Sequence, residues 1–83
     1  MKLLYFAWLR TRIGKGEENL TPPIEVRTVR ALLDWLKDQS PGHAEALKNL
    51  EIVRIAVNQE HVQLDAPVGP NDEVALFPPV TGG

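Results

Sequence analysis

The residues best placed to do chemistry in this sequence form its C-terminal end, Pro78-Pro79-Val80-Thr81-Gly82-Gly83. The last two residues have no side chain, so this end can enter a channel in which any Cβ atom would clash. The only reactive group that it offers is the α-carboxylate of Gly83, which becomes an acyl donor after activation as a mixed anhydride with AMP. A terminal Gly-Gly pair by itself also fits a frayed end without function. The proline pair, the strand before it and the fold predicted below favour a functional end, whose terminal carboxylate is activated, over a frayed one.

The rest of the chain offers no comparable chemistry. There is no cysteine, which excludes disulfides, Cys-based metal sites and sulfur chemistry on a side-chain thiol. His43 and His61 lack a matching set of metal ligands, and Ser40 has no His/Asp constellation to activate it. No phosphate-loop motif is present, so the ATP site that activates Gly83 must belong to another protein. We therefore expect no metal, no cofactor bound by this chain and no catalytic side chain, which argues against an independent enzyme.

Length and charge restrict the class of protein further. The chain has 83 residues, enough for one domain with a modest core. Its net charge is −2 and it has no basic stripe, so we expect no nucleic-acid partner. The longest apolar run, Leu3 to Leu9, is too short to span a bilayer and lacks a cleavage site. We accordingly expect a cytoplasmic protein without a membrane partner.

Hydrophobic periodicity predicts one main helix and several strands. Thr28 is a suitable N-cap, and apolar residues follow it at i, i+3, i+4 and i+7 up to Leu36, so the helix is expected to reach about Gln39. The aromatic and aliphatic run at the N-terminus is typical of a buried strand. Strands are expected at residues 3–9, 24–27, 53–57, 61–64 and 73–77, a loop at residues 10–19, and a short second helix at residues 43–50.

This order of elements predicts an α+β fold of the β-grasp, or ubiquitin-like, class. We expect a mixed sheet of about five strands with the main helix packed on one face. Residues 1–77 would form the β-grasp domain. Residues 78–83 would form a flexible diglycine tail that the two prolines stiffen where it leaves the sheet.

The helix covers only one face of such a sheet, and side-chain alternation assigns residues to the two faces. The set assigned to the covered core is Leu3, Tyr5, Ala7, Leu9, Val74 and Leu76. The set assigned to the open face is Leu4, Phe6, Trp8 and Phe77. Four large apolar side chains there would expose a patch of about a few hundred Å², which is typical of a partner-binding surface. The alternatives are that loops cover this face or that the parity is reversed.

The C-terminal sequence resembles a known family. The stretch from Gly69 through Phe77-Pro78-Pro79-Val80-Thr81-Gly82-Gly83 is similar to the C-terminal signature of molybdopterin synthase small subunits, within the MoaD/ThiS family of ubiquitin-like proteins. The Val57-Asn58-Gln59 turn and the opening Leu4-Tyr5-Phe6-Ala7 strand resemble this family too. The similarity covers the whole chain, and the Phe-Pro-Pro-Val-Thr-Gly-Gly ending is its most specific part.

The resemblance implies a sulfur carrier. A separate ATP-dependent adenylyltransferase would activate Gly83, sulfur transfer would leave a thiocarboxylate, and the tail would enter the large catalytic subunit of molybdopterin synthase. There it would give sulfur to cyclic pyranopterin monophosphate to build the dithiolene. The implied partner-binding residues are Leu4, Phe6, Trp8, Phe77, Pro78, Pro79, Val80, Thr81 and, where an aliphatic residue is usual, His61.

Two other readings stay open. A carrier of the same chemistry would serve thiamine thiazole synthesis or tRNA thiolation, or would modify proteins by conjugation to lysine. A plain interaction module would carry the tail as an inert coil.

Overall fold

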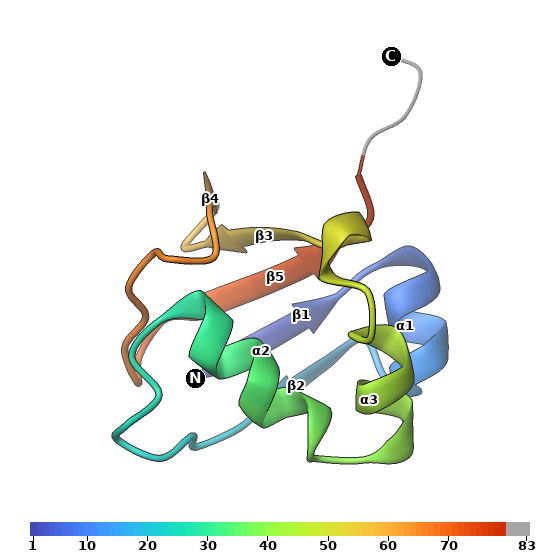
Figure 1. The fold of residues 1–83 in the computed structure, drawn as a ribbon, viewed down its shortest axis with the longest axis horizontal. Coiled ribbons are helices and arrows are strands. Elements are labelled where there is room, and N and C mark those ends of the chain that lie inside the picture. The colour runs from blue at the N-terminus through green and yellow to red at the C-terminus, as the bar shows by residue number, and fades with distance from the viewer. Residues whose placement is uncertain (80–83) are drawn as a thin grey trace.

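A mixed five-stranded sheet forms the centre of the computed structural model, which describes residues 1–79. The strand order is β2-β1-β5-β3-β4; β1 and β5 run parallel, and every other neighbouring pair is antiparallel (Figure 1). The last strand, β5, is the central one, and the first strand, β1, lies directly beside it. The strands are β1 (Lys2–Tyr5), β2 (Glu17–Asn19), β3 (Arg54–Val57), β4 (Glu60–Val62) and β5 (Glu73–Phe77).

The helices pack against one face of this sheet, where they share one core with the strands (Figure 1). The main helix is α2, and the side-chain oxygen of Thr28 caps it by accepting from the backbone N–H of Ala31 at 3.2 Å. Its four core-facing side chains are fully buried, as the spacing predicts. The helices are α1 (Ala7–Ile13), α2 (Val29–Lys37) and α3 (Pro41–Ala46), followed by the 3₁₀ turn η1 (Leu50–Ile52).

The two central strands alternate between buried and half-buried residues. Leu3 and Tyr5 on β1 and Val74 and Leu76 on β5 are fully buried in the core that the sheet and the helices share. The predicted assignment of these four residues to the covered core is confirmed. The mixed sheet, the main helix on one face and the strand at residues 73–77 are confirmed as well.

The predicted strand at residues 3–9 is wrong beyond Tyr5. Phe6 is still extended, but Ala7 has a positive φ of 54° and the chain then turns into α1. Leu9 is buried as predicted, but from the helix, whereas Ala7 is exposed. The signals for this helix were the spacing of Leu9 and Ile13 and the stop at Gly14, whose φ is 96°. The prediction missed these signals because the continuous apolar run from Leu3 to Leu9 is also typical of a buried strand.

Two further predictions around this helix are wrong. The expected loop at residues 10–19 contains the second half of α1 and the edge strand β2, which pairs with β1 although it carries two glutamates and an asparagine. The expected strand at residues 24–27 is absent. Instead, Val26 donates its N–H to the carbonyl of Pro23 in a turn, and Pro22 and Pro23 have no N–H with which to join a ladder.

The second helix forms earlier than predicted. Ser40 caps α3 by accepting from the N–H of His43, and Pro41 stands at its first position, so this helix begins two residues before the predicted start at residue 43. The helix ends at Ala46 and η1 follows. A Cβ atom on Gly42 would lie 2.5 Å from the carbonyl oxygen of Arg12, because α1 and α3 cross there at close range. The strands predicted at 53–57 and 61–64 are confirmed with shifts of one or two residues.

Candidate functional site

The candidate site is the end of β5, from which the C-terminal segment continues. Phe77 is the last residue of the strand, and the N–H of Phe6 donates to the carbonyl of Leu76 at 3.1 Å. Pro78 and Pro79 follow and are half-buried. The predicted flexible tail and the predicted roles of Val80, Thr81, Gly82 and Gly83 lie outside the described residues.

The open face of the sheet carries an apolar strip that leads to this end. Leu4 pairs with Ala75 across β1 and β5, and Ala56 pairs with Ala75 across β3 and β5. Leu4, Ala75 and Phe77 lie on the face of the sheet opposite α2 and are half-buried. These residues share the parity that was assigned to the open face, so the assignment is confirmed for Leu4 and Phe77.

Phe6 is the most exposed aromatic residue beside the strip, with 49% of its surface accessible. It follows β1 and precedes the helix, and parallel pairing places it next to the end of β5. A phenylalanine exposed to this extent beside half-buried apolar neighbours is typical of a surface that binds another molecule. We use the name docking strip for Leu4, Phe6, Ala75 and Phe77.

His61 extends the docking strip toward β4. Its ring lies 5.3 Å from the ring of Phe77, centroid to centroid, at an interplanar angle of 63°. The two residues are brought together by pairing of β3 with both β4 and β5. The structure thus places His61 in edge contact with Phe77, another residue of the predicted partner-binding set; the role of both in binding stays a prediction.

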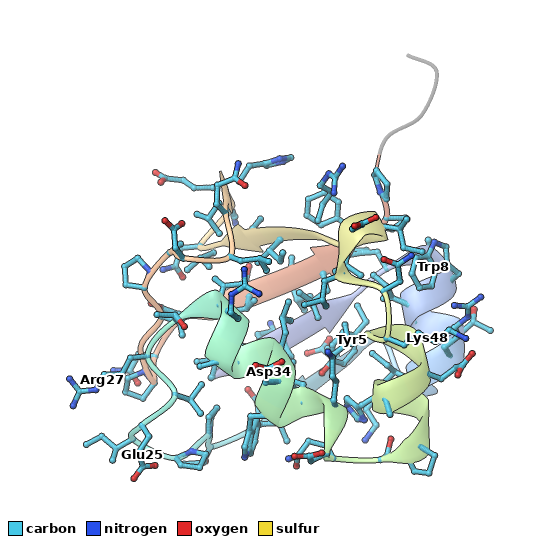
Figure 2. All side chains as sticks on the ribbon, in the orientation of Figure 1. Tyr5, Trp8, Glu25, Arg27, Asp34 and Lys48 are labelled. Atoms are coloured by element: carbon cyan, nitrogen blue, oxygen red, sulfur yellow. The ribbon has the colours of Figure 1, made fainter. Side chains whose placement is uncertain are left out.

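Trp8 lies apart from the strip because it belongs to α1 and not to β1. It is half-buried against the core, and the guanidinium carbon of Arg12 lies 4.7 Å from its ring centroid. Figure 2 shows Trp8 at the end of the molecule from which the C-terminal segment continues. Its assignment to the open strand face is therefore wrong, while its role in partner binding stays a prediction.

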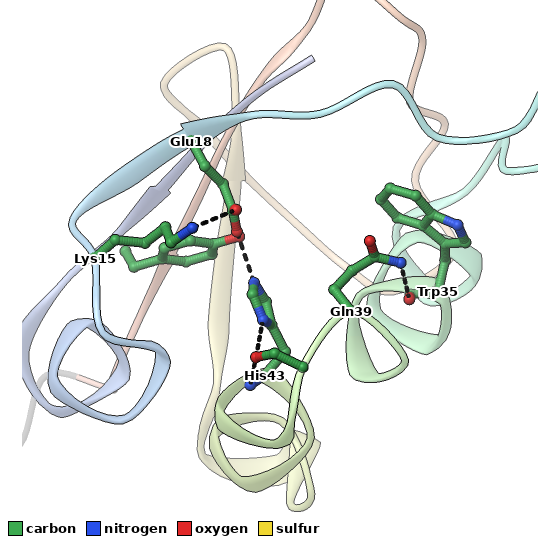
Figure 3. A network of polar contacts seen from close by, with 7 residues as sticks. Lys15, Glu18, Trp35, Gln39 and His43 are labelled. Carbon is green, nitrogen blue, oxygen red and sulfur yellow. Dashed lines mark hydrogen bonds and ion pairs between the residues drawn. The ribbon is translucent and has the colours of Figure 1, made fainter.

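A buried polar network joins β1, β2 and α3 on the covered side (Figure 3). The Tyr5 hydroxyl donates to Oε2 of Glu18 at 2.6 Å, and Nε2 of His43 lies 2.6 Å from the same oxygen. Nδ1 of His43 lies 2.7 Å from Oγ of Ser40. On the solvent side, Nζ of Lys15 lies 3.4 Å from Oε1 of Glu18. Sequence analysis missed this network because its members are far apart along the chain.

The network perturbs the acidity of two of its members. Burial, reinforced by the hydrogen bond to Glu18, raises the pKa of Tyr5 far above its ordinary value. Burial alone would raise the pKa of Glu18 as well, but the hydrogen bonds from Tyr5 and His43 and the nearby charges of His43 and Lys15 together hold that pKa below its usual value. Glu18 is thus ionised in the folded protein and accepts from both neighbours.

The network is not arranged as a catalytic site. Ser40 does have a histidine and a carboxylate behind it, contrary to the sequence prediction, but His43 is only 4% exposed and the Ser40 oxygen already accepts from the His43 N–H. A substrate has no access to His43 in this arrangement. Within residues 1–79, no three His, Asp or Glu side chains are grouped as metal ligands, and no helix is long and apolar enough to cross a membrane.

The fold defines a class of protein. A mixed sheet with strand order β2-β1-β5-β3-β4 and a main helix across one face make this a ubiquitin-like β-grasp protein. The chain belongs to the ThiS family, whose model matches residues 3–83.

Known proteins with similar sequences and structures agree with this assignment. The chain is 40% identical to the molybdopterin synthase sulfur carrier subunit of Escherichia coli, with coverage of 100% of this chain and 99% of that protein. It is 36% identical to the subunit of the same name from Dictyostelium discoideum, covering 99% and 94%. Among solved structures, SAMP1 from Haloferax volcanii is 28% identical with a TM-score of 0.74, covering 100% and 98%.

Proposed function

We propose that this chain is a sulfur carrier subunit of molybdopterin synthase that holds sulfur as a thiocarboxylate on Gly83. The observation that carries the proposal is the ThiS family match, which extends to the last residue, together with 40% identity over the full chain to a relative named for this role. The relative is called a subunit, which supports a partner that supplies the catalytic side chains. In this proposal the carrier supplies Gly83 and the docking strip, and the partner supplies the catalytic side chains.

The proposed chemistry proceeds in three steps. A separate adenylyltransferase joins the Gly83 carboxylate to AMP from ATP and releases pyrophosphate. A donor of sulfide-level sulfur then attacks the acyl carbon, the new C–S bond replaces the C–O bond to the phosphate, and AMP leaves. In the large synthase subunit the sulfur of the thiocarboxylate forms a bond to cyclic pyranopterin monophosphate, and water hydrolyses the acyl–sulfur bond, so the carrier returns to its carboxylate form. Two such rounds supply the two sulfurs of the dithiolene.

The geometry at the end of β5 supports this role. Phe77 is held in the sheet by pairing with Arg54, so the segment after it starts from a rigid base. Proline restricts φ at the next two positions, which favours an extended exit. Six residues beyond Phe77 reach at most about 20 Å, which is enough to enter a channel while the docking strip contacts its rim.

Intact-mass spectrometry tests the proposal directly. The chain is co-expressed with the activating enzyme under sulfur-replete conditions, and we expect a species in which one oxygen at the C-terminus is replaced by sulfur. Deletion of Gly83 should abolish both this species and synthase activity, with an unchanged thermal unfolding midpoint as the control for folding. Absence of the sulfur species in the wild-type chain, or full activity after the deletion, would contradict the proposal.

One observation favours a second candidate, a protein modifier. The similar SAMP1 structure belongs to a protein called a small archaeal modifier protein. A modifier would use the same activated Gly83 but transfer the acyl group to a lysine amine. Affinity purification of the tagged chain followed by peptide mass spectrometry separates the two, because only a modifier leaves a Gly-Gly remnant on lysines of other proteins.

A further inference from the structure

A groove lies at the end of the molecule opposite the C-terminal segment. It has a volume of about 610 Å³, within the range of about 300–1,000 Å³ that is usual for ligand pockets. Its walls include Pro22, Pro23, Ile24, Arg27, Pro67 and Pro70, and we call it the proline groove. Figure 2 shows Arg27 at one end of the molecule and Trp8 at the other, where the chain continues beyond Phe77. The proline groove is therefore separate from the docking strip.

Two backbone contacts join the walls of the proline groove. The N–H of Val68 donates to the carbonyl of Arg27 at 2.9 Å, and Thr28 forms an antiparallel bridge with Pro67. Proline also restricts φ at four positions of the lining. The groove is thus formed before a ligand binds, and a preformed site lowers the entropic cost of binding.

The proline groove is apolar apart from one cation. Among the described residues that line it, Arg27 has the only charged side chain. The Nε atom of Arg27 donates to the carbonyl of Ile24 at 3.3 Å, and its other guanidinium nitrogens have no hydrogen-bond partner within residues 1–79. Ile24 itself is 77% exposed, so the lining offers apolar surface as well as N–H donors. Guanidinium groups bind carboxylates through paired N–H bonds, which indicates an apolar ligand with a carboxylate.

The carboxylates that are near the groove in sequence do not occupy Arg27. Glu25 does not line the groove, and no ion pair of Arg27 is present in the described part of the chain. Asp72 follows Pro70 closely, but its two carboxylate oxygens already accept from the Asn58 side-chain amide and the Gly69 N–H. The charge of Arg27 is therefore left for a ligand.

The C-terminal sequence of this chain has the chemistry that the groove requires. Residues 78–83 read Pro-Pro-Val-Thr-Gly-Gly and contain three apolar residues, no charged side chain and the terminal carboxylate of Gly83. Proline-containing segments favour an extended conformation that binds in grooves at low entropic cost. The segment and the groove are thus complementary in polarity and in charge.

Strand direction disfavours binding of the segment to the groove of its own molecule. The strands β1 and β5 are parallel, and the groove residues Met1 and Pro70 lie just before them, whereas the segment follows Phe77 at the far end of β5. Returning along β5 would take about 13 Å of the roughly 20 Å that six residues can reach. Too little of the segment would then remain to fill the groove.

We propose that the proline groove binds residues 78–83 of a second copy of this chain, with Arg27 paired to the Gly83 carboxylate. This interaction goes beyond the proposed function and does not depend on sulfur chemistry. Because the groove and the segment lie at opposite ends, each copy donates one segment and accepts another. Such a head-to-tail association does not close at the dimer. A segment that is held in this way is withheld from any other protein.

Dilution of the full-length chain tests the proposal. In amide NMR spectra recorded from about 2 mM down to about 0.05 mM, the signals of Arg27, Val68, Gly82 and Gly83 should shift together, whereas Phe6 should not shift. Six residues and one ion pair make a small interface, so we expect a dissociation constant of about 0.1–1 mM. Sedimentation equilibrium over the same range should give an average mass that rises without a plateau at the dimer.

Two variants separate the groove from net charge. Arg27→Glu places a carboxylate opposite the Gly83 carboxylate and should lower the association constant tenfold or more. Arg30→Glu is the matched control, because it changes the net charge equally at an exposed position of α2 that does not line the groove. We expect the control to associate within about twofold of the wild-type chain. Arg27→Gln repeats the test if the charge reversal lowers the thermal unfolding midpoint.

A mixing experiment identifies which copy supplies which part. Val80→Lys places a second cation beside Arg27 in an apolar groove and should disable the segment while leaving the groove intact. Arg27→Glu disables the groove and leaves the segment intact. Neither variant should associate alone. When unlabelled Arg27→Glu is added to isotope-labelled Val80→Lys, the Val68 amide of the labelled chain should shift as it does in the wild type.

Each outcome supports or overturns the proposal. Spectra and masses that do not change with concentration would overturn it, and equal weakening by Arg30→Glu would leave net charge as the cause. A groove signal that is independent of concentration yet changed in Val80→Lys would replace the second copy by the segment of the same molecule. A mass that stops at the dimer would overturn the head-to-tail arrangement. The Gly83 thiocarboxylate is not a readout of these experiments, so the proposed function and this association can fail separately.

Discussion

The imidazole of His61 lies edge-on against the phenyl ring of Phe77, 5.3 Å away, and so joins the edge strand β4 to the end of the central strand. Edge contacts of this kind between aromatic rings stabilise by about 0.5–1.5 kcal/mol beyond area burial. The contact restricts the rotamers of Phe77 at the position from which the C-terminal segment continues. Phe77, the last residue of β5, is thus packed against His61 within the chain itself.

Phe6 should be the most sensitive single position of the docking strip. Phe6→Ser removes an aromatic group that is 49% exposed, so it should weaken binding to the large synthase subunit by about 2 kcal/mol, or roughly thirtyfold, with little loss of stability. Isothermal titration calorimetry measures the change. Ile24→Ser is the matched control, because Ile24 is 77% exposed and lies in the turn before α2, away from the strip. Equal losses in both variants would argue against a localised strip.

Glu18 should make stability depend on pH in the acidic range. Because the folded protein holds the pKa of Glu18 below its ordinary value, the stabilising contribution is present above the unfolded pKa of about 4.3 and is lost as the pH falls through the lower folded pKa. Glu18→Gln should cost about 1–3 kcal/mol at pH 7. Urea unfolding of both proteins from pH 7 down to about pH 3 should show this difference shrinking below about pH 4.5. A difference that stays constant over that range would refute the ionised network.

Gly42 should tolerate no side chain. A Cβ atom there would lie 2.5 Å from the Arg12 carbonyl oxygen, which belongs to the backbone of α1 and cannot rotate away. Gly42→Ala should therefore destabilise the protein by about 1–3 kcal/mol. Gly16→Ala is the control, because its nearest neighbour is the flexible Arg10 side chain at 3.1 Å. Thermal unfolding that ranks the two variants in the opposite order would contradict the close helix crossing.

Ala7 should gain from replacement by glycine. Its φ of 54° costs an L-residue about 1 kcal/mol, which glycine avoids. Part of this gain is offset by the larger backbone entropy of glycine in the unfolded chain, so Ala7→Gly should stabilise by up to about 1 kcal/mol. Ala44→Gly, inside α3, should instead destabilise by about 1 kcal/mol. Chemical denaturation of both variants measures the two free energies, and destabilisation by Ala7→Gly would exclude the left-handed conformation.

The elements that sequence analysis placed correctly are those with a local pattern. The main helix α2 has its own N-cap and an apolar stripe at helical spacing, and β5 alternates up to a proline pair that cannot continue a ladder. The elements that it missed lack such a pattern. The strand β2 contains no apolar residue and exists because β1 presents an unpaired edge to it. The helix α1 begins inside an apolar run, at a positive φ that no alanine prefers.

The candidate site divides in the same way. The Gly-Gly end, the absence of cysteine and the lack of a nucleotide motif are properties of the sequence itself, and they favoured the Gly83 carboxylate as a candidate acyl donor, whereas its proposed sulfur chemistry is implied by the family resemblance. Which side chains surround the base of that end was decided by the tertiary structure alone. His61 and Arg54 reach Phe77 through strand pairing. In the separate buried network, Glu18 reaches His43 across 25 residues of chain. Residue types and their spacing along the chain are given directly by the sequence. Contacts between residues that are distant in the sequence form only when the sheet and helices bury their apolar faces together.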